Sequence, residues 1–252
     1  MRIVVIGGSG NAGSAIVRAL ARRGADVHPL SRSGKAIAGA SGVQADIVSG
    51  AGLEAALEGA AVIVDACNSR NPIDPKPFTI GARNIVAAAE RAGVERAVVL
   101  SILGVERSKL SYHRRKHEQE LTYLSSPLEV SVVRAAQFHE WSTDQFEAGS
   151  ALGAIPVVLG GRMQPVAVSE VADLCADEAL EPSGKRFIEI AGPQVRLSRD
   201  LAKSWQAATG ARGLIVNGPF PPSMLDYLRS GANFTEQHKG RIGFEEWLSR
   251  RR

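Results

Sequence analysis

The sequence predicts an α/β fold: a doubly wound parallel sheet covered by helices, followed by a smaller C-terminal region. Through residues 1–135, apolar runs rich in β-branched residues alternate with helical segments, which is the pattern of parallel βαβ units. A glycine-rich loop, residues 7–13, separates the first apolar run from the first helical segment. After residue 135 the alternation becomes irregular. We therefore expect a core over residues 1–135 and a smaller cap over residues 136–252, contiguous with the core.

The elements of the core follow from periodicity and from glycine stops. The run "RIVVIG" reads as a buried strand. The segment after it has apolar residues at helical spacing and ends at Gly24, a typical helix stop. Gly93 ends another such segment. In chain order, the expected strands are 2–7, 25–30, 43–47, 61–67, 96–101 and 129–135, and the expected helices are 10–24, 52–60, 78–93 and 111–126.

The cap contains shorter elements. Ser169 and Glu170 suit a helix start within 163–180, because a hydroxyl caps free N–H groups and an acid complements the helix dipole. Ser198 and Gly210 delimit a second helix. Residues 138–141 are expected on a loop at the ligand edge of the sheet. The remaining expected elements are a strand at 186–192 and helices at 221–231 and 244–251.

Composition excludes several classes of protein. The chain has 252 residues, 44% of them hydrophobic and 22% charged, which suits a globular protein with a sizeable core. The net charge of +4 is spread along the chain without interleaved aromatics, so nucleic acid is not expected as a partner. Cys67 and Cys175 have no metal spacing and favour a reduced, cytoplasmic compartment. The N-terminal apolar run is too short for a membrane span. The oligomeric state stays open between a monomer and a homodimer.

The glycine-rich loop predicts a dinucleotide site. Gly7, Gly10 and Gly13 stand between a strand and a helix. The first allows a tight turn, the second lets the backbone approach a pyrophosphate, and the third allows close contact between helix and strand. The free N–H groups at the helix N-terminus attract phosphate. A purely structural glycine turn is the alternative.

The end of the second strand selects the dinucleotide. NAD sites usually place an acid there for the ribose hydroxyls, but this chain has Ser31, Arg32 and Ser33. A guanidinium pairs with a 2′-phosphate, so the expected cofactor is NADP(H). A solvated surface arginine is the alternative. Asp46 follows the third strand and is expected either to accept from the adenine amino group or to form a turn.

These segments together resemble a known family. "GGSGNAG", "LSRSG", "VVLSILGV", "YHRRKHEQEL", "SVVRAAQFHEW" and "MQPVAVSEVADL" are similar to the NmrA-like NAD(P)-binding branch of the atypical short-chain dehydrogenases/reductases. The resemblance covers nearly the whole chain. It implies a Rossmann core, NADP binding and a small C-terminal substrate region. By position it implies cofactor contacts at Gly7, Gly10, Asn11, Ala12, Gly13, Arg32, Asp46, Ile47, Ala66, Cys67, Asn68, Ser101 and Lys116.

Tyr112 and Lys116 form the candidate catalytic pair, with Ser101 as the third member. Residues four apart share a helix face, and a nearby ammonium is expected to lower the pKa of a tyrosine, which makes it a better acid–base group. The resemblance implies that Lys116 grips the nicotinamide ribose. Ser101 precedes Tyr112 by only 11 residues, a shorter spacing than in classical members. Alternatively, Tyr112 is an exposed or capping aromatic at the helix start, and Lys116 pairs with Glu120 on a solvated face.

The expected function is reduction of a small hydrophobic carbonyl, enone or quinone-like substrate by NADPH. Ile102, Phe138, His139 and Trp141 are the candidate substrate residues, and His139 is either an alternative proton donor or a structural histidine. The second hypothesis is a non-catalytic protein that senses NADP(H) or binds a partner, because the resembled branch includes such members. A nucleotide-sugar epimerase or dehydratase is a third and weaker alternative.

Overall fold

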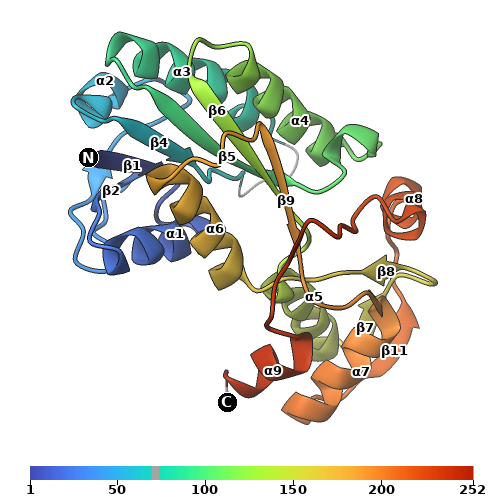
Figure 1. Ribbon diagram of the computed structural model, residues 1–252. Helices are drawn as coiled ribbons and strands as arrows, with labels where there is room; N and C mark the ends of the chain where they lie inside the picture. The colour runs from blue at the N-terminus through green and yellow to red at the C-terminus, as the bar shows by residue number, and fades with distance from the viewer. Residues whose placement is uncertain (70–73, 252) are drawn as a thin grey trace. The chain divides into compact units, whose positions relative to one another are not determined.

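The computed structural model describes residues 1–69 and 74–251. In this part of the chain, eight strands form one sheet in the order β12-β9-β6-β5-β4-β1-β2-β3 (Figure 1). The strand order reverses direction at β1, which is the signature of a doubly wound sheet. The strands are β1 (Arg2–Ile6), β2 (Asp26–Ser31), β3 (Val43–Gln44), β4 (Val62–Asp65), β5 (Arg96–Ile102), β6 (Glu129–Ala135), β9 (Phe187–Ala191) and β12 (His238–Lys239).

The sheet is parallel throughout its centre. Ile6 of β1 stands beside Leu30 of β2 and Asp65 of β4, and Asp65 stands beside Val99 of β5. The β2–β3 and β9–β12 pairs are parallel as well. This register aligns the carboxyl ends of β1, β2, β4 and β5 at one edge. The predicted α/β fold of the Rossmann type is confirmed.

Helices cover both faces of this sheet. Figure 1 shows α1 (Asn11–Arg22) and α6 (Val168–Leu180) on one face, and α2 (Leu53–Leu57), α3 (Ala82–Arg91) and α4 (Ser111–Leu124) on the other. The apolar positions predicted for α1 are largely buried, and the helix is followed by Gly24 with φ +73°. One hydrophobic core lies between the sheet and the helices α2, α3 and α4. It includes Val4, Ile6, Leu30, Ile63, Ile85, Val99 and Val132.

Two expected elements differ from the structure. The helix expected over 78–93 begins instead with a π-helical turn, Pro77–Gly81, in which the Gly81 N–H reaches the Lys76 carbonyl at 2.8 Å. The strand expected over 43–47 ends at Gln44. It ends early because the Asp46 carboxylate accepts the backbone N–H groups of Val48 and Ser49 and turns the chain away from the sheet.

The chain divides into two compact units that each combine separate segments. The first unit is Met1–Ser101, Ser111–Val133 and Val171–Ile188, and the second is Ile102–Leu110, Arg134–Glu170 and Glu189–Arg252. The predicted domain boundary at residue 135 therefore stays a prediction. No helix in the described ranges is long and apolar enough to cross a membrane.

The second unit holds shorter elements around its own core. It includes α5 (His139–Ala151). The loop expected around His139 is wrong, because α5 begins at that residue. The other elements are β7 (Ala154–Val157) paired with β11 (Leu214–Asn217), β8 (Arg162–Met163) paired with β10 (Arg196–Leu197), and the helices α7 (Ser198–Thr209), α8 (Pro222–Ser230) and α9 (Phe244–Ser249). All three tryptophans of the chain, Trp141, Trp205 and Trp247, belong to this unit.

Candidate functional site

The loop between β1 and α1 has the geometry of a phosphate-binding turn. Gly7 has φ +73°, in the left-handed region that favours glycine. A Cβ on Gly13 would lie 2.1 Å from the Gly7 carbonyl oxygen, so only glycine allows α1 to pack this closely on the loop. Helix α1 has no side-chain N-cap. Its first N–H groups, at Asn11, Ala12 and Gly13, have no intrahelical acceptor and are suited to an anion.

The loop that follows β2 carries the residue expected to select the cofactor. Ser31 is buried and its hydroxyl lies 3.3 Å from that of Ser33, whereas Arg32 is exposed. Gln44 donates to the Arg32 carbonyl at 3.1 Å and holds the backbone of this loop. Within residues 1–69 and 74–251, the Arg32 guanidinium makes no ion pair. It is therefore free to bind an added phosphate.

Asp46 forms a turn. Its Oδ1 accepts the Val48 N–H at 2.8 Å and the Ser49 N–H at 3.3 Å. Asn84 of α3 donates to the carbonyls of Ile47 and Val48 at 2.9 and 3.0 Å, which ties this turn to the helix. Of the two roles that the sequence left open for Asp46, the turn is present in the structure. An adenine contact by Asp46 or Ile47 stays a prediction.

The segment after β4 lies directly beside the glycine loop. A Cβ on Gly7 would approach Cys67 Cα to 2.8 Å, so the two backbones are in close contact. Ala66 and Cys67 are buried and Asn68 is exposed. The Cys67 N–H donates to Asp65 Oδ1 at 2.9 Å, which fixes the start of this segment. Burial raises the pKa of the Cys67 thiol well above its usual range, so the thiol stays protonated at neutral pH.

Helix α4 presents Tyr112 and Lys116 to the same region of the first unit. The ring of Phe78 contacts both: its centroid lies 5.6 Å from that of Tyr112, edge to face, and 5.4 Å from Lys116 Nζ. Lys116 is only 4% exposed and donates to the Leu100 carbonyl at 2.7 Å and to Gln119 Oε1 at 2.5 Å. The solvated pair with Glu120 that was considered for Lys116 does not fit this burial.

Tyr112 is protonated in this environment. Its hydroxyl donates to Asn68 Oδ1 at 3.0 Å. Burial raises its pKa to about 12, and the hydrogen bond to Asn68 only partly opposes this effect. The expectation that Lys116 lowers this pKa is therefore wrong, because burial is the larger effect and Lys116 directs its hydrogen bonds to Leu100 and Gln119.

Ser101 ends β5 with a buried hydroxyl. It is 4% exposed, and its Oγ has no hydrogen-bond partner among the described residues. Buried hydroxyls usually have a partner, so this atom is suited to a bound ligand. Together with the uncapped helix, the close glycine contacts and the unpaired Arg32, it fits an NAD(P)H dinucleotide lying along the carboxyl ends of β1, β2, β4 and β5.

The candidate substrate residues Ile102, Phe138, His139 and Trp141 belong to the second unit. Phe138 forms an isolated bridge with Val166 and precedes α5. Trp141 borders an apolar hollow with about 270 Å³ of empty space, some of it open to solvent; Phe146, Phe220 and Leu228 also line it. Trp141 thus stands beside apolar side chains of the second unit, and its contact with a substrate stays a prediction.

His139 is a core residue of the second unit. It is 0% exposed, its Nε2 lies 3.1 Å from the Ile242 carbonyl, and its ring packs on Phe244 and Trp247. Burial lowers its pKa to about 4, so the ring is neutral at pH 7. This placement favours the structural role over that of a proton donor.

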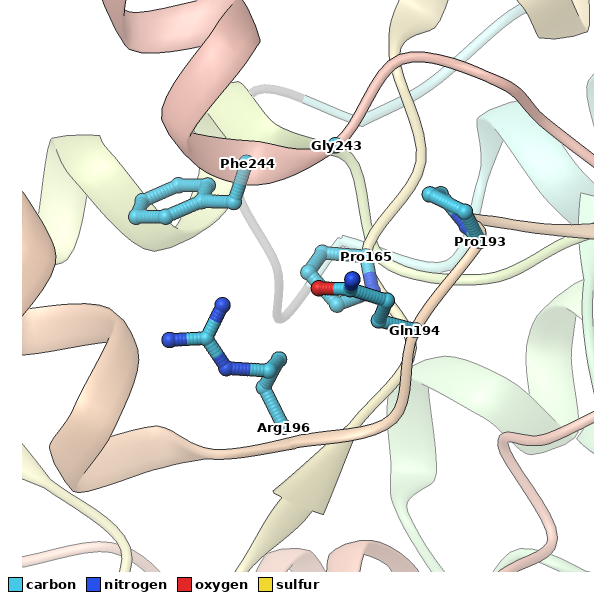
Figure 2. A pocket seen from close by; sticks show the side chains of 6 residues that line it. All are labelled: Pro165, Pro193, Gln194, Arg196, Gly243 and Phe244. Carbon is cyan, nitrogen blue, oxygen red and sulfur yellow. The ribbon is translucent and has the colours of Figure 1, made fainter.

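A second hollow of this unit is shown in Figure 2. It contains about 180 Å³ of empty space, some of it open to solvent, and Arg196 and Phe244 stand on its wall with Pro165, Pro193, Gln194 and Gly243. The Arg196 guanidinium is already paired with Glu245 at 2.8 Å. None of the residues predicted for the site lines this hollow.

Sequence reasoning missed a buried polar group beneath the site. Asp65, Gln119 and Tyr123 are each 0% exposed and are joined by hydrogen bonds. The only signal in the sequence was an aspartate at the end of an otherwise apolar strand, "VIVDAC". Neither Gln119 nor Tyr123 stands out from a polar helix sequence.

Comparison with known families agrees with this geometry. Residues 7–191 match the family model described as NAD(P)H-binding. The chain belongs to this NAD(P)H-binding family. The match begins at the first glycine of the phosphate loop and runs through β9, so it includes every candidate cofactor residue. The predicted membership of an NAD(P)-binding family is confirmed, and assignment to its NmrA-like branch stays a prediction.

Known proteins of similar sequence or fold have different roles. The photosystem II assembly factor Ycf39 of Synechocystis sp. is 24% identical, over 99% of this chain and 80% of that protein. The NADPH-dependent quinone oxidoreductase QOR2 of Escherichia coli, complexed with NADPH, has a TM-score of 0.81 at 19% identity and covers 98% and 99% of the two chains. The triphenylmethane reductase of Citrobacter sp., complexed with NADP(H), has a TM-score of 0.81 at 15% identity, with 99% of both chains covered. At these identities, the two solved structures establish the fold alone.

Proposed function

We propose that this protein is an NADP(H)-dependent oxidoreductase that reduces a small hydrophobic carbonyl, enone or quinone-like substrate. The observation that carries the proposal is the exposed guanidinium of Arg32, which makes no ion pair with the described residues and stands directly after β2, where NAD sites usually place an acid. A guanidinium binds a 2′-phosphate through two parallel hydrogen bonds, whereas an acid would repel it. Two solved structures with the same fold, one in complex with NADPH and one with NADP(H), support this choice.

The other residues have complementary roles in binding. The N–H groups of Asn11 and Ala12 meet the pyrophosphate at the start of α1. The backbone of Ala66, Cys67 and Asn68 passes the riboses. Lys116 donates to the nicotinamide ribose, since its ammonium has three N–H groups and two of them are already bonded within the protein.

When bound, NADPH would supply the hydride that reduces the substrate carbon. Tyr112 or water would donate a proton to the substrate oxygen. A phenol with a pKa of about 12 is protonated at neutral pH and acts first as a donor; it recovers its proton from solvent. Ser101 Oγ, which is buried and lacks a partner in the described residues, donates to the same oxygen or to the cofactor.

Cofactor affinity tests the proposal directly. Arg32→Ser is expected to weaken NADPH binding by about 30-fold, because it removes a charge-assisted contact, while NADH binding changes little. Lys35→Ser is the matched control, since Lys35 is an exposed cation three residues further along the same loop. Tighter binding of NADH than of NADPH by the unmodified protein would contradict the proposal. A panel of quinones, enones and carbonyls, followed by NADPH absorbance, then identifies the substrate class.

A second function is favoured by the state of Tyr112. Its hydroxyl is bonded to Asn68 and its pKa is raised, which is a poor starting point for acid–base turnover. A relative that matches 99% of this chain is named an assembly factor. The alternative is therefore a non-catalytic protein that binds NADP(H) and a partner. Complexes that form only with NADP(H) present, together with no turnover of any substrate in the panel, support it. Loss of a robust reductase activity in Tyr112→Phe excludes it as the main role.

A further inference from the structure

Four buried polar side chains of the first unit form a hydrogen-bond network next to the predicted cofactor site. Lys116 is 4% exposed, and Gln119, Asp65 and Tyr123 are each 0% exposed. Charged side chains such as those of Lys116 and Asp65 are almost never fully buried unless they have a partner. The network begins at Lys116, which is expected to contact the nicotinamide ribose, and ends at Tyr123 in the core.

The hydrogen bonds of this network are short, and each one shares a residue with the next. Lys116 Nζ donates to Gln119 Oε1 at 2.5 Å, and Gln119 Nε2 donates to Asp65 Oδ2 at 2.7 Å. The Tyr123 hydroxyl donates to the same Asp65 oxygen at 2.7 Å. Asp65 Oδ1 accepts the N–H of Cys67 at 2.9 Å. The carboxylate therefore links the lysine to the segment that contacts the glycine loop.

An amide side chain suits the position of Gln119 in the middle of this network. The side chain of Gln119 must accept from an ammonium at one end and donate to a carboxylate at the other, and an amide has one group of each kind. A glutamate would face Asp65 with like charge. An apolar side chain would leave a buried cation and a buried anion without partners, which is costly.

We propose that Gln119 is a positioning residue for Lys116. This inference rests on the proposed function of Lys116 as ligand of the nicotinamide ribose. Gln119 and the Leu100 carbonyl take two of the three ammonium protons and hold the remaining N–H toward the cofactor. Asp65 orients the Gln119 amide, so that the position of Lys116 does not depend on rotation of a long, flexible side chain.

Two probes separate positioning from simple structural support. NADPH contains the nicotinamide ribose, whereas adenosine 2′,5′-bisphosphate contains only the adenosine half with its 2′-phosphate. Gln119→Met is expected to weaken NADPH binding about tenfold and to change binding of the bisphosphate by less than about twofold. Tyr123→Phe is the matched control: it removes a bond to the same carboxylate and is expected to lower the melting temperature without separating the two probes.

A double-variant cycle tests whether Gln119 acts through Lys116. Lys116→Met alone and Lys116→Met with Gln119→Met are expected to bind NADPH equally, because the second change has nothing left to position. If Gln119→Met does not fold, Gln119→Asn carries the same test, since it keeps the amide but is one methylene too short to reach both partners.

Each result decides the inference. Equal loss of affinity for both probes, no loss for either, or additive effects in the cycle would overturn the positioning role. If the unmodified protein binds neither probe, the proposed cofactor itself is wrong. If it prefers NADH, the comparison is repeated with NADH and AMP, and the role of Gln119 is judged separately from the choice of cofactor.

Discussion

Replacing His139 by glutamine removes a buried base from the second unit while keeping a donor near the Ile242 carbonyl. The neutral ring donates from Nε2 to this carbonyl at 3.1 Å, and the amide nitrogen of a glutamine side chain occupies a similar place. We expect the His139→Gln variant to make the stability of this unit less sensitive to acid. The test decides whether the buried ring of His139 is a source of acid sensitivity in this unit.

The magnitude follows from the two pKa values of the ring. Burial is the main cause that lowers the pKa from 6.5 to about 4, while the bond to Ile242 and the nearby Glu245 partly oppose it. Between these values the unfolded chain binds a proton and the folded chain does not. The contribution of the neutral His139 ring to the free energy of unfolding is therefore fully present above pH 6.5 and is lost as the pH falls toward 4. The loss from His139 between pH 7 and pH 5 amounts to about 2 kcal/mol.

Tryptophan fluorescence is the appropriate assay, because all three tryptophans lie in the second unit and Trp247 packs on the His139 ring at 5.3 Å. Urea unfolding at pH 7 and pH 5 gives the free-energy difference for each variant. The control is Phe244→Leu, which removes packing against the same ring but no titrating group. The reasoning is refuted if the loss between pH 7 and pH 5 is the same in His139→Gln as in the unmodified protein.

Three further predictions concern the first unit and the substrate. Gly13→Ala is expected to destabilise the protein by about 2 kcal/mol and to abolish NADPH binding, because its Cβ would lie 2.1 Å from a backbone oxygen. The control is Gly243→Ala, because a Cβ there would meet nothing within 4 Å and the backbone φ of −69° suits any residue. Thermal unfolding with cofactor titration measures both variants. Tyr112→Phe is expected to lower kcat at least about 100-fold if the phenol donates the proton, with little change in NADPH affinity; an unchanged kcat assigns the proton to water. Trp141→Ala is expected to raise KM for an apolar quinone with kcat nearly unchanged, and steady-state kinetics with a small polar ketone provides the comparison.

The structure explains why parts of the site were hidden in the sequence. Gln119 and Tyr123 stand in a helix with a largely polar sequence, and only the packing of α4 turns them toward Asp65. The pKa of Tyr112 was expected to fall because of a neighbouring lysine. It rises instead, because burial of the ring is a property of the folded environment and not of the spacing between two residues.

The sequence by itself determined the alternation of strands and helices through residue 135, the glycine loop and the absence of an acid after the second strand, because these depend on local periodicity and on backbone conformations that only glycine allows. Tertiary structure alone decided which polar side chains are buried together and how their protons are held. Asp65, Lys116, Gln119 and Tyr123 come from a strand and from a helix separated from it by more than forty residues. Their hydrogen bonds exist only because the parallel sheet and α4 bring distant segments into contact, and no pattern along the chain records that contact.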